Sequence, residues 1–326
     1  MGGWLHIYPQ KPQFCAMTER MNKDTPLQTF PPHLVWLLVG LTLGWGLNWP
    51  IMKIVLFEMA PMHFRFLCLL FGAVGLFTIA RLSGMPIRVP QGQWSRLIAI
   101  ASVNMMIWNV LAVFGIRLIA SGRAAILGYT MPMWGVIIAT WLLKEPFTRR
   151  RALGTALGGA GLLLLLGEEV QAVGRSPLGA VLMVGAAVSW ALGTIMMKRW
   201  PVSLPTSSFV AWQMLISATP IIVVALFFET GTFNPFALSL WPMLGVFYNV
   251  FVAFNFCYWA WTKIALVAPV GVSSLAVMMT PVVGVFSGML LLGETPHWQD
   301  YAALALVVAS LATVLMPAKT MAAFVE

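Results

Sequence analysis

The chain has 326 residues, of which 60% are hydrophobic and 9% are charged. Soluble domains contain roughly 45–50% apolar and about 25% charged residues, so this composition excludes a water-soluble globular protein. The net charge of +9 is also found in nucleic-acid-binding proteins, but in a chain this apolar it favours basic loops on the cytoplasmic side of a membrane, and no nucleic-acid partner is expected.

Runs of about 20 apolar residues, the length needed to cross a bilayer, predict ten transmembrane helices in an all-α integral membrane protein. In chain order the predicted spans cover residues 34–56, 62–81, 97–116, 123–143, 152–167, 178–198, 208–228, 240–262, 268–292 and 299–317. The flanking residues 1–33 and 318–326 are predicted to be tails. An even number of spans places both tails on the same side of the lipid bilayer.

The lysines and arginines alternate between the connections and therefore predict the orientation. Fourteen of the 19 lie in the tails and in the connections on their side, whereas only four are expected on the other side. Those four are Arg65, Arg117, Arg123 and Arg175. Because cytoplasmic loops carry the excess of basic residues, both tails are predicted to be cytoplasmic, and the bacterial inner (plasma) membrane is the expected location.

An internal repeat appears when the fourth predicted span is aligned with the ninth. The matching positions lie 149 residues apart and pair Ala124 with Ser273, Pro132 with Pro281, Gly135 with Gly284 and Glu145 with Glu294. The first and sixth spans match 145 residues apart, pairing Trp45 with Trp190 and Lys53 with Lys198. Each copy, residues 34–167 and residues 178–317, holds five spans. Because five is odd, the second copy enters the membrane from the opposite face, which is an inverted repeat.

These doubled features, together with the GWGLNWPIMK sequence of the first span, resemble the EamA branch of the drug/metabolite transporter superfamily over roughly residues 34–317. Within that branch the chain is most similar to the YddG-type exporters. The resemblance implies ten helices around a central cavity and a small-molecule solute as partner. It also implies export of amino acids, including aromatic ones, or of related metabolites by alternating access.

Polar and aromatic side chains at helical spacing mark the residues expected to line the cavity. Trp45, Asn48 and Trp49 share one face of the first span, since positions i, i+3 and i+4 lie together on a helix. Amides in hydrocarbon need partners, so such faces are expected to point into the bundle. The candidate residues are Trp45, Asn48, Trp49, Asn104, Trp108, Tyr129, Trp190, Tyr248, Asn255, Tyr258, Ser273 and Met278. The competing interpretation makes the amides interhelical hydrogen bonds and the tryptophans packing.

Two further patterns concern helix bending and helix packing. Pro132 and Pro281 are hinge candidates, because a proline inside a helix removes a backbone hydrogen bond and bends the helix; a static kink is the alternative. Gly154, Gly158 and Gly161 form a small-residue face that is predicted to pack against a neighbouring helix.

The placement of charges bears on how transport is driven. The interiors of the predicted spans contain no Asp or Glu, and no His at mid-depth, which favours facilitated diffusion or exchange. Lys53 and Lys198 are the deepest charges, and we expect them either to reach the interface, to attract a substrate carboxylate or to stabilise one closed end. A proton-coupled multidrug or metabolite exporter is the alternative.

Two other classes compete with a transporter. An enzyme needs a nucleophile, a metal cluster or an acidic pair at depth, but the sequence has no HExxH motif, no CxxC pair and no His near Ser273. No catalytic residue, metal or cofactor is therefore expected. A non-transporting membrane receptor is the third class, and solute flux in liposomes separates it from a transporter.

Overall fold

The structure, a computed structural model, describes residues 32–142, 144, 147–171, 177–261 and 270–315. Within these residues every regular element is a helix. The chain divides into two compact units, Met1–Trp36 and Leu37–Glu326.

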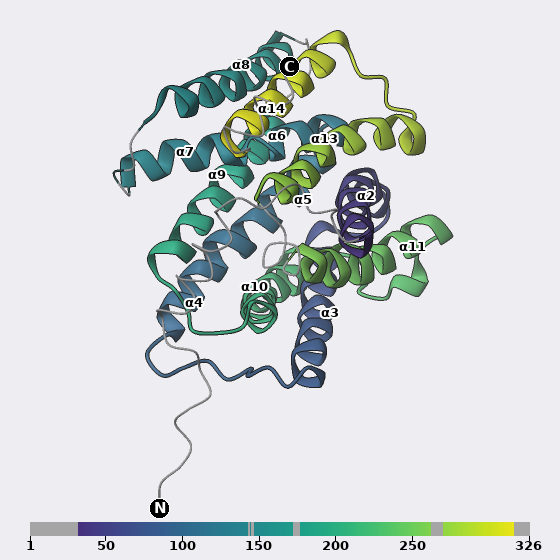
Figure 1. Ribbon diagram of the computed structural model, residues 1–326. Helices are drawn as coiled ribbons and strands as arrows, with labels where there is room; N and C mark the ends of the chain where they lie inside the picture. The colour runs from purple at the N-terminus through teal and green to yellow at the C-terminus, as the bar shows by residue number, and fades with distance from the viewer. Residues whose placement is uncertain (1–31, 143, 145–146, 172–176, 262–269, 316–326) are drawn as a thin grey trace, which may run out of the picture. The chain divides into compact units, whose positions relative to one another are not determined.

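Ten helical rods follow one another along the described part of the chain (Figure 1). They are α2 (Pro32–Val55), α3 (Pro61–Leu82), α4–η1–α5 (Trp94–Ile100, Ala101–Ile107, Trp108–Leu118), α6–α7 (Ser121–Gly128, Met131–Leu142), α8 (Arg149–Gln171), α9 (Leu178–Arg199), α10 (Thr206–Phe228), α11–η3 (Leu240–Tyr248, Asn249–Cys257), α13 (Val270–Leu292) and α14 (Trp298–Leu315). A short 3-10 helix, η2 (Pro235–Ala237), precedes α11. Each rod coincides with one of the ten predicted spans.

The lengths and composition of the rods fit a bilayer. Seven of the described rods are long and apolar enough to cross a membrane. Met278–Leu292 of α13 and Trp298–Val314 of α14 form shorter apolar helices, and α8 coincides with the fifth predicted span after an opening run of three arginines. The all-α membrane fold predicted from the apolar runs is therefore confirmed.

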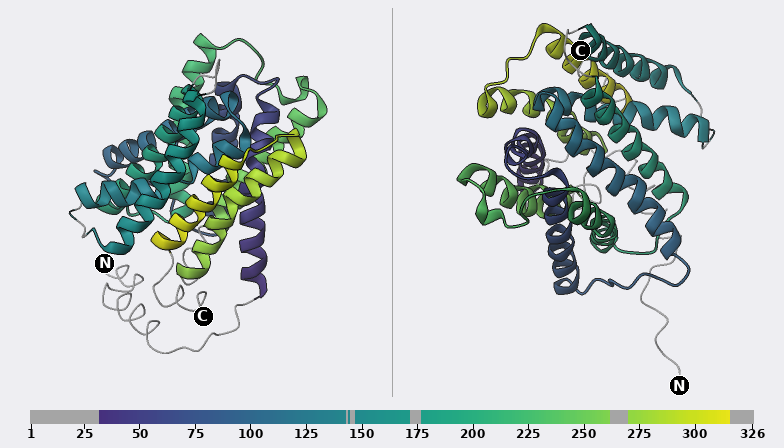
Figure 2. Two further views of the ribbon diagram at one scale, coloured as in Figure 1. Left: turned by 90° about the horizontal axis from the view of Figure 1, so that it is seen from above. Right: turned by 180° about the vertical axis from the view of Figure 1, so that it is seen from behind.

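Several helices pack against their counterparts from the other predicted repeat. α3 packs against α10, α6 against α13, and α8 against α14, so the second, fourth and fifth helices of one half contact those of the other. Figure 1 and the rear view in Figure 2 show α14 lying along α8. Helices paired in this way are what a pseudo-twofold axis in the membrane plane predicts.

The glycine face of α8 accounts for its close contact with α14. A Cβ atom at Gly154 would lie 2.6 Å from Val314, and one at Gly158 would lie 2.9 Å from the Ser310 hydroxyl. The Ser310 hydroxyl also donates a hydrogen bond of 2.6 Å to the Gly154 carbonyl. The prediction that this small-residue face packs against a neighbouring helix is therefore confirmed.

The two repeated prolines have different surroundings. A turn at Tyr129 and Thr130 separates α6 from α7, and Pro132 is the second residue of α7. Pro281, by contrast, lies inside α13, which is continuous from Val270 to Leu292. The helical rod is therefore broken next to Pro132. At Pro281 the helix α13 continues and loses one backbone hydrogen bond.

Two π-helical segments, which the sequence analysis did not anticipate, occupy the third and eighth rods. η1 contains Asn104 and η3 contains Asn249, and these asparagines lie 145 residues apart, the same separation that relates the first and sixth spans. A π-helical turn holds an extra residue and leaves backbone carbonyls displaced from the α-helical ladder, and such turns are frequent at functional sites. Equivalent rods of the two halves thus carry the same irregularity.

Candidate functional site

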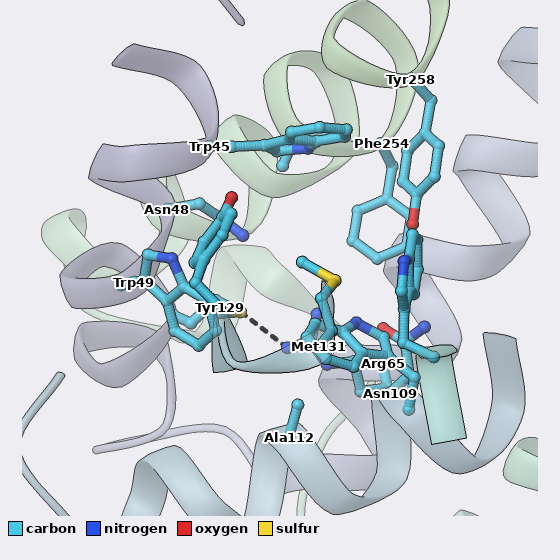
Figure 3. A pocket seen from close by; sticks show the side chains of 14 residues that line it. Trp45, Asn48, Trp49, Arg65, Asn109, Ala112, Tyr129, Met131, Phe254 and Tyr258 are labelled. Atoms are coloured by element: carbon cyan, nitrogen blue, oxygen red, sulfur yellow. Dashed lines mark hydrogen bonds between the residues drawn. The ribbon is translucent and has the colours of Figure 1, made fainter. Parts of the chain in front are cut away.

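A cavity of about 100 Å³ lies among helices of both halves (Figure 3). α2, α3, α5, the α6–α7 turn and α7 contribute lining residues from the first half, while α9 and the η3 rod contribute them from the second. The lining residues are Trp45, Asn48, Trp49, Met52, Arg65, Trp108, Asn109, Ala112, Tyr129, Met131, Trp190, Ala253, Phe254 and Tyr258. Seven of these fourteen are among the candidates from the sequence: Trp45, Asn48, Trp49, Trp108, Tyr129, Trp190 and Tyr258.

Aromatic pairs form much of the wall. Trp45 meets Tyr258 edge to face, with ring centroids 5.6 Å apart, and the Trp45 indole donates a hydrogen bond of 3.3 Å to the Ala253 carbonyl. Trp108 and Trp190, which come from α5 and α9, lie 5.1 Å apart. These contacts hold the rings in fixed orientations, so the cavity presents rigid aromatic faces and edges.

A third pair joins α2 to the turn that interrupts the fourth rod. The rings of Trp49 and Tyr129 are 6.3 Å apart at an interplanar angle of 63°. Tyr129 is one of the two turn residues between α6 and α7, so the break in this rod lies directly at the cavity wall.

Three other candidates form hydrogen bonds outside the cavity lining. The Asn104 amide donates to the Trp190 carbonyl at 3.1 Å, and the Tyr248 hydroxyl donates to the Gly44 carbonyl at 2.8 Å. Asn255 donates to the Val250 carbonyl of its own π-helical segment at 2.9 Å. These contacts are those expected from the interpretation of polar residues as hydrogen bonds within and between helices.

The remaining candidates are Met278 and Ser273. Met278 is buried and is not among the residues that line the cavity. The side chain of Ser273 lies outside the described residues.

Arg65 is the most important lining residue that the sequence analysis did not select. It was assigned to the less basic side of the membrane, but the structure buries it within α3 at 3% exposure. Its Nη2 donates to the Met52 sulfur at 2.6 Å, and its guanidinium carbon lies 5.1 Å from the centre of the Phe64 ring. The sequence did contain a sign of this burial, because Arg65 is the fourth residue of a span predicted to begin at residue 62 and therefore lies inside that span.

Asn48 and Asn109 supply the amide groups of the cavity. The Asn109 amide donates to the Met105 carbonyl in the π-helical segment at 2.8 Å, so it satisfies the irregular backbone. The Asn48 Oδ1 atom is buried and accepts no hydrogen bond from the described part of the protein. The Asn48 amide oxygen is thus an unused acceptor in the wall.

The carboxylates near helix ends act as caps. Glu229 accepts hydrogen bonds from the backbone N–H groups of Met62, at 2.9 Å, and His63, at 3.2 Å, which open α3. Glu294 accepts from the N–H and the hydroxyl of Ser121, at 2.6 and 2.9 Å, at the start of α6. A carboxylate is favourable here because it satisfies unpaired N–H groups at the positive end of the helix dipole.

Lys53 joins the cap at the start of α6. Its Nζ lies 3.5 Å from Glu294 Oε1 and donates to the Ile119 carbonyl at 2.5 Å. Lys53 is absent from the described cavity lining, so its contacts fit the interpretation of a link at one closed end better than that of a substrate contact. The Lys198 side chain is outside the described residues.

Asp300 is a buried acidic residue near the start of the tenth predicted span. This residue lies in the first turn of α14 at 5% exposure, and its carboxylate pairs with Arg123, with N–O distances of 2.8 and 3.1 Å. Arg123 is buried as well, at 6% exposure. His63 is buried beside Glu229, with 3.1 Å between Nδ1 and Oε2. Burial of Arg123 and Asp300 is tolerable because each of these two charges has the other as its partner.

The described residues that line the cavity supply groups that can bind a solute, and they include no carboxylate or imidazole that could act as a general acid or base. Its described lining holds one cation, amides and aromatic rings, without Asp, Glu or His. Within the described residues no group of three or more His, Cys, Asp or Glu is placed to hold a metal ion. The arrangement is suited to holding a small solute reversibly.

Comparisons with known proteins agree with this picture. Residues 34–167 and residues 177–316 each match the EamA-like transporter family. The uncharacterized transporter YoaV of Bacillus subtilis is 25% identical over 259 residues, covering 79% of this chain and 88% of that protein. A probable amino-acid metabolite efflux pump of Salmonella typhimurium is 26% identical over 289 residues, covering 82% of this chain and 89% of that protein.

A solved crystal structure is similar to the whole arrangement. It has a TM-score of 0.64 at 19% sequence identity and covers 90% of this chain and 99% of that chain. At this identity the likeness shows the fold alone.

Proposed function

We propose that this chain, which belongs to the EamA-like transporter family, exports amino acids, including aromatic ones, or closely related metabolites across the bacterial inner membrane. The chain is a membrane transporter, and the amino-acid substrate is the proposed refinement. The observation that carries it is the aromatic wall formed by Trp45, Tyr258, Trp108 and Trp190, contributed by both halves of the chain. Rigid indole and phenol rings contact apolar and aromatic side chains favourably.

The relatives support the same substrate class. The Salmonella typhimurium relative and one from Escherichia coli, 26% identical over 260 residues, are both named probable amino-acid metabolite efflux pumps. Because this chain covers 89% and 84% of those proteins, the likeness extends over nearly their whole length.

Alternating access is the proposed mechanism. The cavity has lining residues from both matched halves, and movement of one half against the other exposes such a cavity to each side in turn. The turn at Tyr129 and Thr130, next to Pro132, lies at the cavity wall and is a suitable point for bending. Pro281 is the proposed counterpart in the second half, where a missing hydrogen bond weakens a continuous helix.

Facilitated diffusion or exchange is the proposed energetic mode. A proton-coupled carrier needs a titratable group that senses the solute, and the described cavity lining contains no Asp, Glu or His. Proton coupling is the second candidate, because buried His63 and partly buried Glu229 form a pair elsewhere in the transporter.

Counterflow in liposomes tests the function directly. We expect preloaded unlabelled L-phenylalanine to accelerate uptake of labelled L-phenylalanine, whereas preloaded glucose or uridine leaves uptake at the level of protein-free liposomes. An imposed pH gradient is expected to drive no uphill accumulation. Flux of sugars or nucleosides without amino acids contradicts the substrate class, and accumulation that a protonophore abolishes contradicts facilitated transport.

A further inference from the structure

Arg65 is a buried cation with unused hydrogen-bonding capacity. Among the described residues, its buried Nε has no hydrogen-bond partner, and its Nη2 has only the weakly accepting sulfur of Met52. The guanidinium carbon lies 5.1 Å from the centre of the Phe64 ring and 6.0 Å from that of Phe254. A charge inside a membrane span is costly unless it is paired, so a residue in this state marks a site where a partner is expected to bind.

No acidic side chain among the described residues neutralises Arg65. Glu229 and Glu294 cap α3 and α6, and Glu58 accepts hydrogen bonds from Ser239. Asp300 is paired with Arg123. With these carboxylates engaged elsewhere, the charge of Arg65 is available to an anion that enters the cavity.

The Asn48 amide supplies a complementary group in the same cavity. Its Oδ1 accepts no hydrogen bond from the described residues, whereas Arg65 can only donate. Figure 3 shows both side chains among the aromatic rings, Asn48 on α2 and Arg65 on α3. A donor cation and an amide acceptor within an aromatic wall match a solute that carries a carboxylate, a hydrogen-bond donor and an apolar side chain.

We infer that Arg65 binds the carboxylate of the transported solute and that Asn48 accepts a hydrogen bond from its ammonium group. This inference rests on the proposed function and deepens it, since it states which end of an amino acid the cavity recognises. A guanidinium offers a planar set of N–H donors that pairs with both oxygens of a carboxylate, whereas a lysine ammonium acts as a point charge. The carboxylate is therefore the required group, and the ammonium contributes less.

Competition in the wild-type protein tests which group is required. Three solutes share a phenyl ring: L-phenylalanine has both charged groups, 3-phenylpropionate lacks the ammonium, and phenethylamine lacks the carboxylate. Against counterflow of labelled L-phenylalanine, we expect 3-phenylpropionate to inhibit and phenethylamine to require at least a tenfold higher concentration. Inhibition by phenethylamine at the concentration effective for 3-phenylpropionate overturns the inference.

Variants at Arg65 provide the second arm. We expect Arg65→Gln to lose at least tenfold in L-phenylalanine counterflow and Arg65→Lys to lose less. Arg88→Gln, the same charge change on an exposed loop residue, is the matched control and is expected to behave as wild type. Folded yield is measured by size-exclusion chromatography, and if Arg65→Gln does not fold, the wild-type competition decides alone.

The two proposals fail in different ways. If L-phenylalanine is exchanged equally by wild type and Arg65→Gln, amino-acid export stands and the role of Arg65 is overturned. If the wild type exchanges 3-phenylpropionate but no amino acid, and Arg65→Gln abolishes this exchange, amino-acid export is overturned and the carboxylate site stands. A wild-type protein that exchanges no carboxylate-bearing solute overturns both.

Discussion

The carboxylate of Glu294 holds the first turn of α6 through Ser121, accepting hydrogen bonds from its backbone N–H at 2.6 Å and from its hydroxyl at 2.9 Å. Glu294 precedes α14, so this contact ties the connection between α13 and α14 to the helix that leads to the cavity turn. Lys53 reaches the same carboxylate from α2. Three parts of the membrane bundle therefore meet at one acidic group.

We predict that Glu294→Ala lowers the free energy of unfolding by about 2 kcal/mol or more, because it leaves partly buried donors unsatisfied. Thermal unfolding in detergent measures the change. Glu58→Ala is the control, since Glu58 also accepts hydrogen bonds at a helix start, from Ser239, but is exposed. Equal losses for the two variants contradict the prediction.

The buried pair of Arg123 and Asp300 supports a second prediction. Replacing one partner, as in Asp300→Ala, leaves an uncompensated buried charge and is expected to cost about 3–5 kcal/mol. The double variant Arg123→Met with Asp300→Leu is expected to recover most of that loss, because two apolar side chains need no counter-ion. The melting temperatures of the single and double variants measure the energetic coupling between Arg123 and Asp300. If the losses of the single variants simply add up in the double variant, the two residues are not coupled and the prediction is contradicted.

The exposed cap at α11 gives a pH-dependent prediction. Hydrogen bonds from the side chain and backbone of Ser239 lower the pKa of Glu58 below its ordinary value of 4.5. A lowered folded pKa means that the contribution to stability is present above the unfolded pKa and is lost as pH falls through the folded pKa. We expect wild type to melt above Glu58→Gln at pH 7, with the gap closing below about pH 4. If the difference in melting temperature between wild type and Glu58→Gln does not change with pH, the ionised carboxylate of Glu58 is excluded as its cause.

Two amides from the sequence candidates are predicted to behave differently. Asn48 lines the cavity. Asn255 instead donates a hydrogen bond to the Val250 carbonyl, and its Oδ1 atom packs so closely against Gly75 that a Cβ atom there would overlap it. We therefore expect Asn48→Ala to reduce L-phenylalanine counterflow while folded yield is kept, and Asn255→Ala to reduce folded yield and flux together. The ratio of flux to folded protein is the measurement, and the same ratio for both variants contradicts the distinction.

The orientation of the transporter is a prediction from its basic residues. A cysteine introduced at exposed Arg88, expected on the cytoplasmic side, is predicted to react with an impermeant maleimide only after cells are permeabilised. A cysteine at Phe236, which is 72% exposed before α11, is expected to react in intact cells. Cys68 and Cys257 are buried, and Cys15 is replaced by serine in both variants so that the tail adds no label. The reverse pattern places both tails outside.

The sequence alone determined the membrane class, the ten spans and the doubled features of the two halves. Apolar length is a local property, because each span must satisfy its own backbone hydrogen bonds, and it therefore survives in the sequence whatever the packing. The glycine face at Gly154 and Gly158 was also predictable, since residues four apart share one side of a helix. The matched spacing of Pro132 and Pro281 was evident, but not that only the first lies beside a break in its rod.

The tertiary structure decided which polar residues face the cavity. Helical periodicity relates residues within one helix, but the rotation of that helix about its axis depends on its neighbours, so Asn48 lines the cavity while Asn104 bonds to Trp190. The role of Arg65 was hidden for a related reason. Position along the chain estimates depth in the membrane. The burial of Arg65, and the absence of a counter-ion to it among the described residues, depend on side chains from distant helices, such as Phe254 of η3.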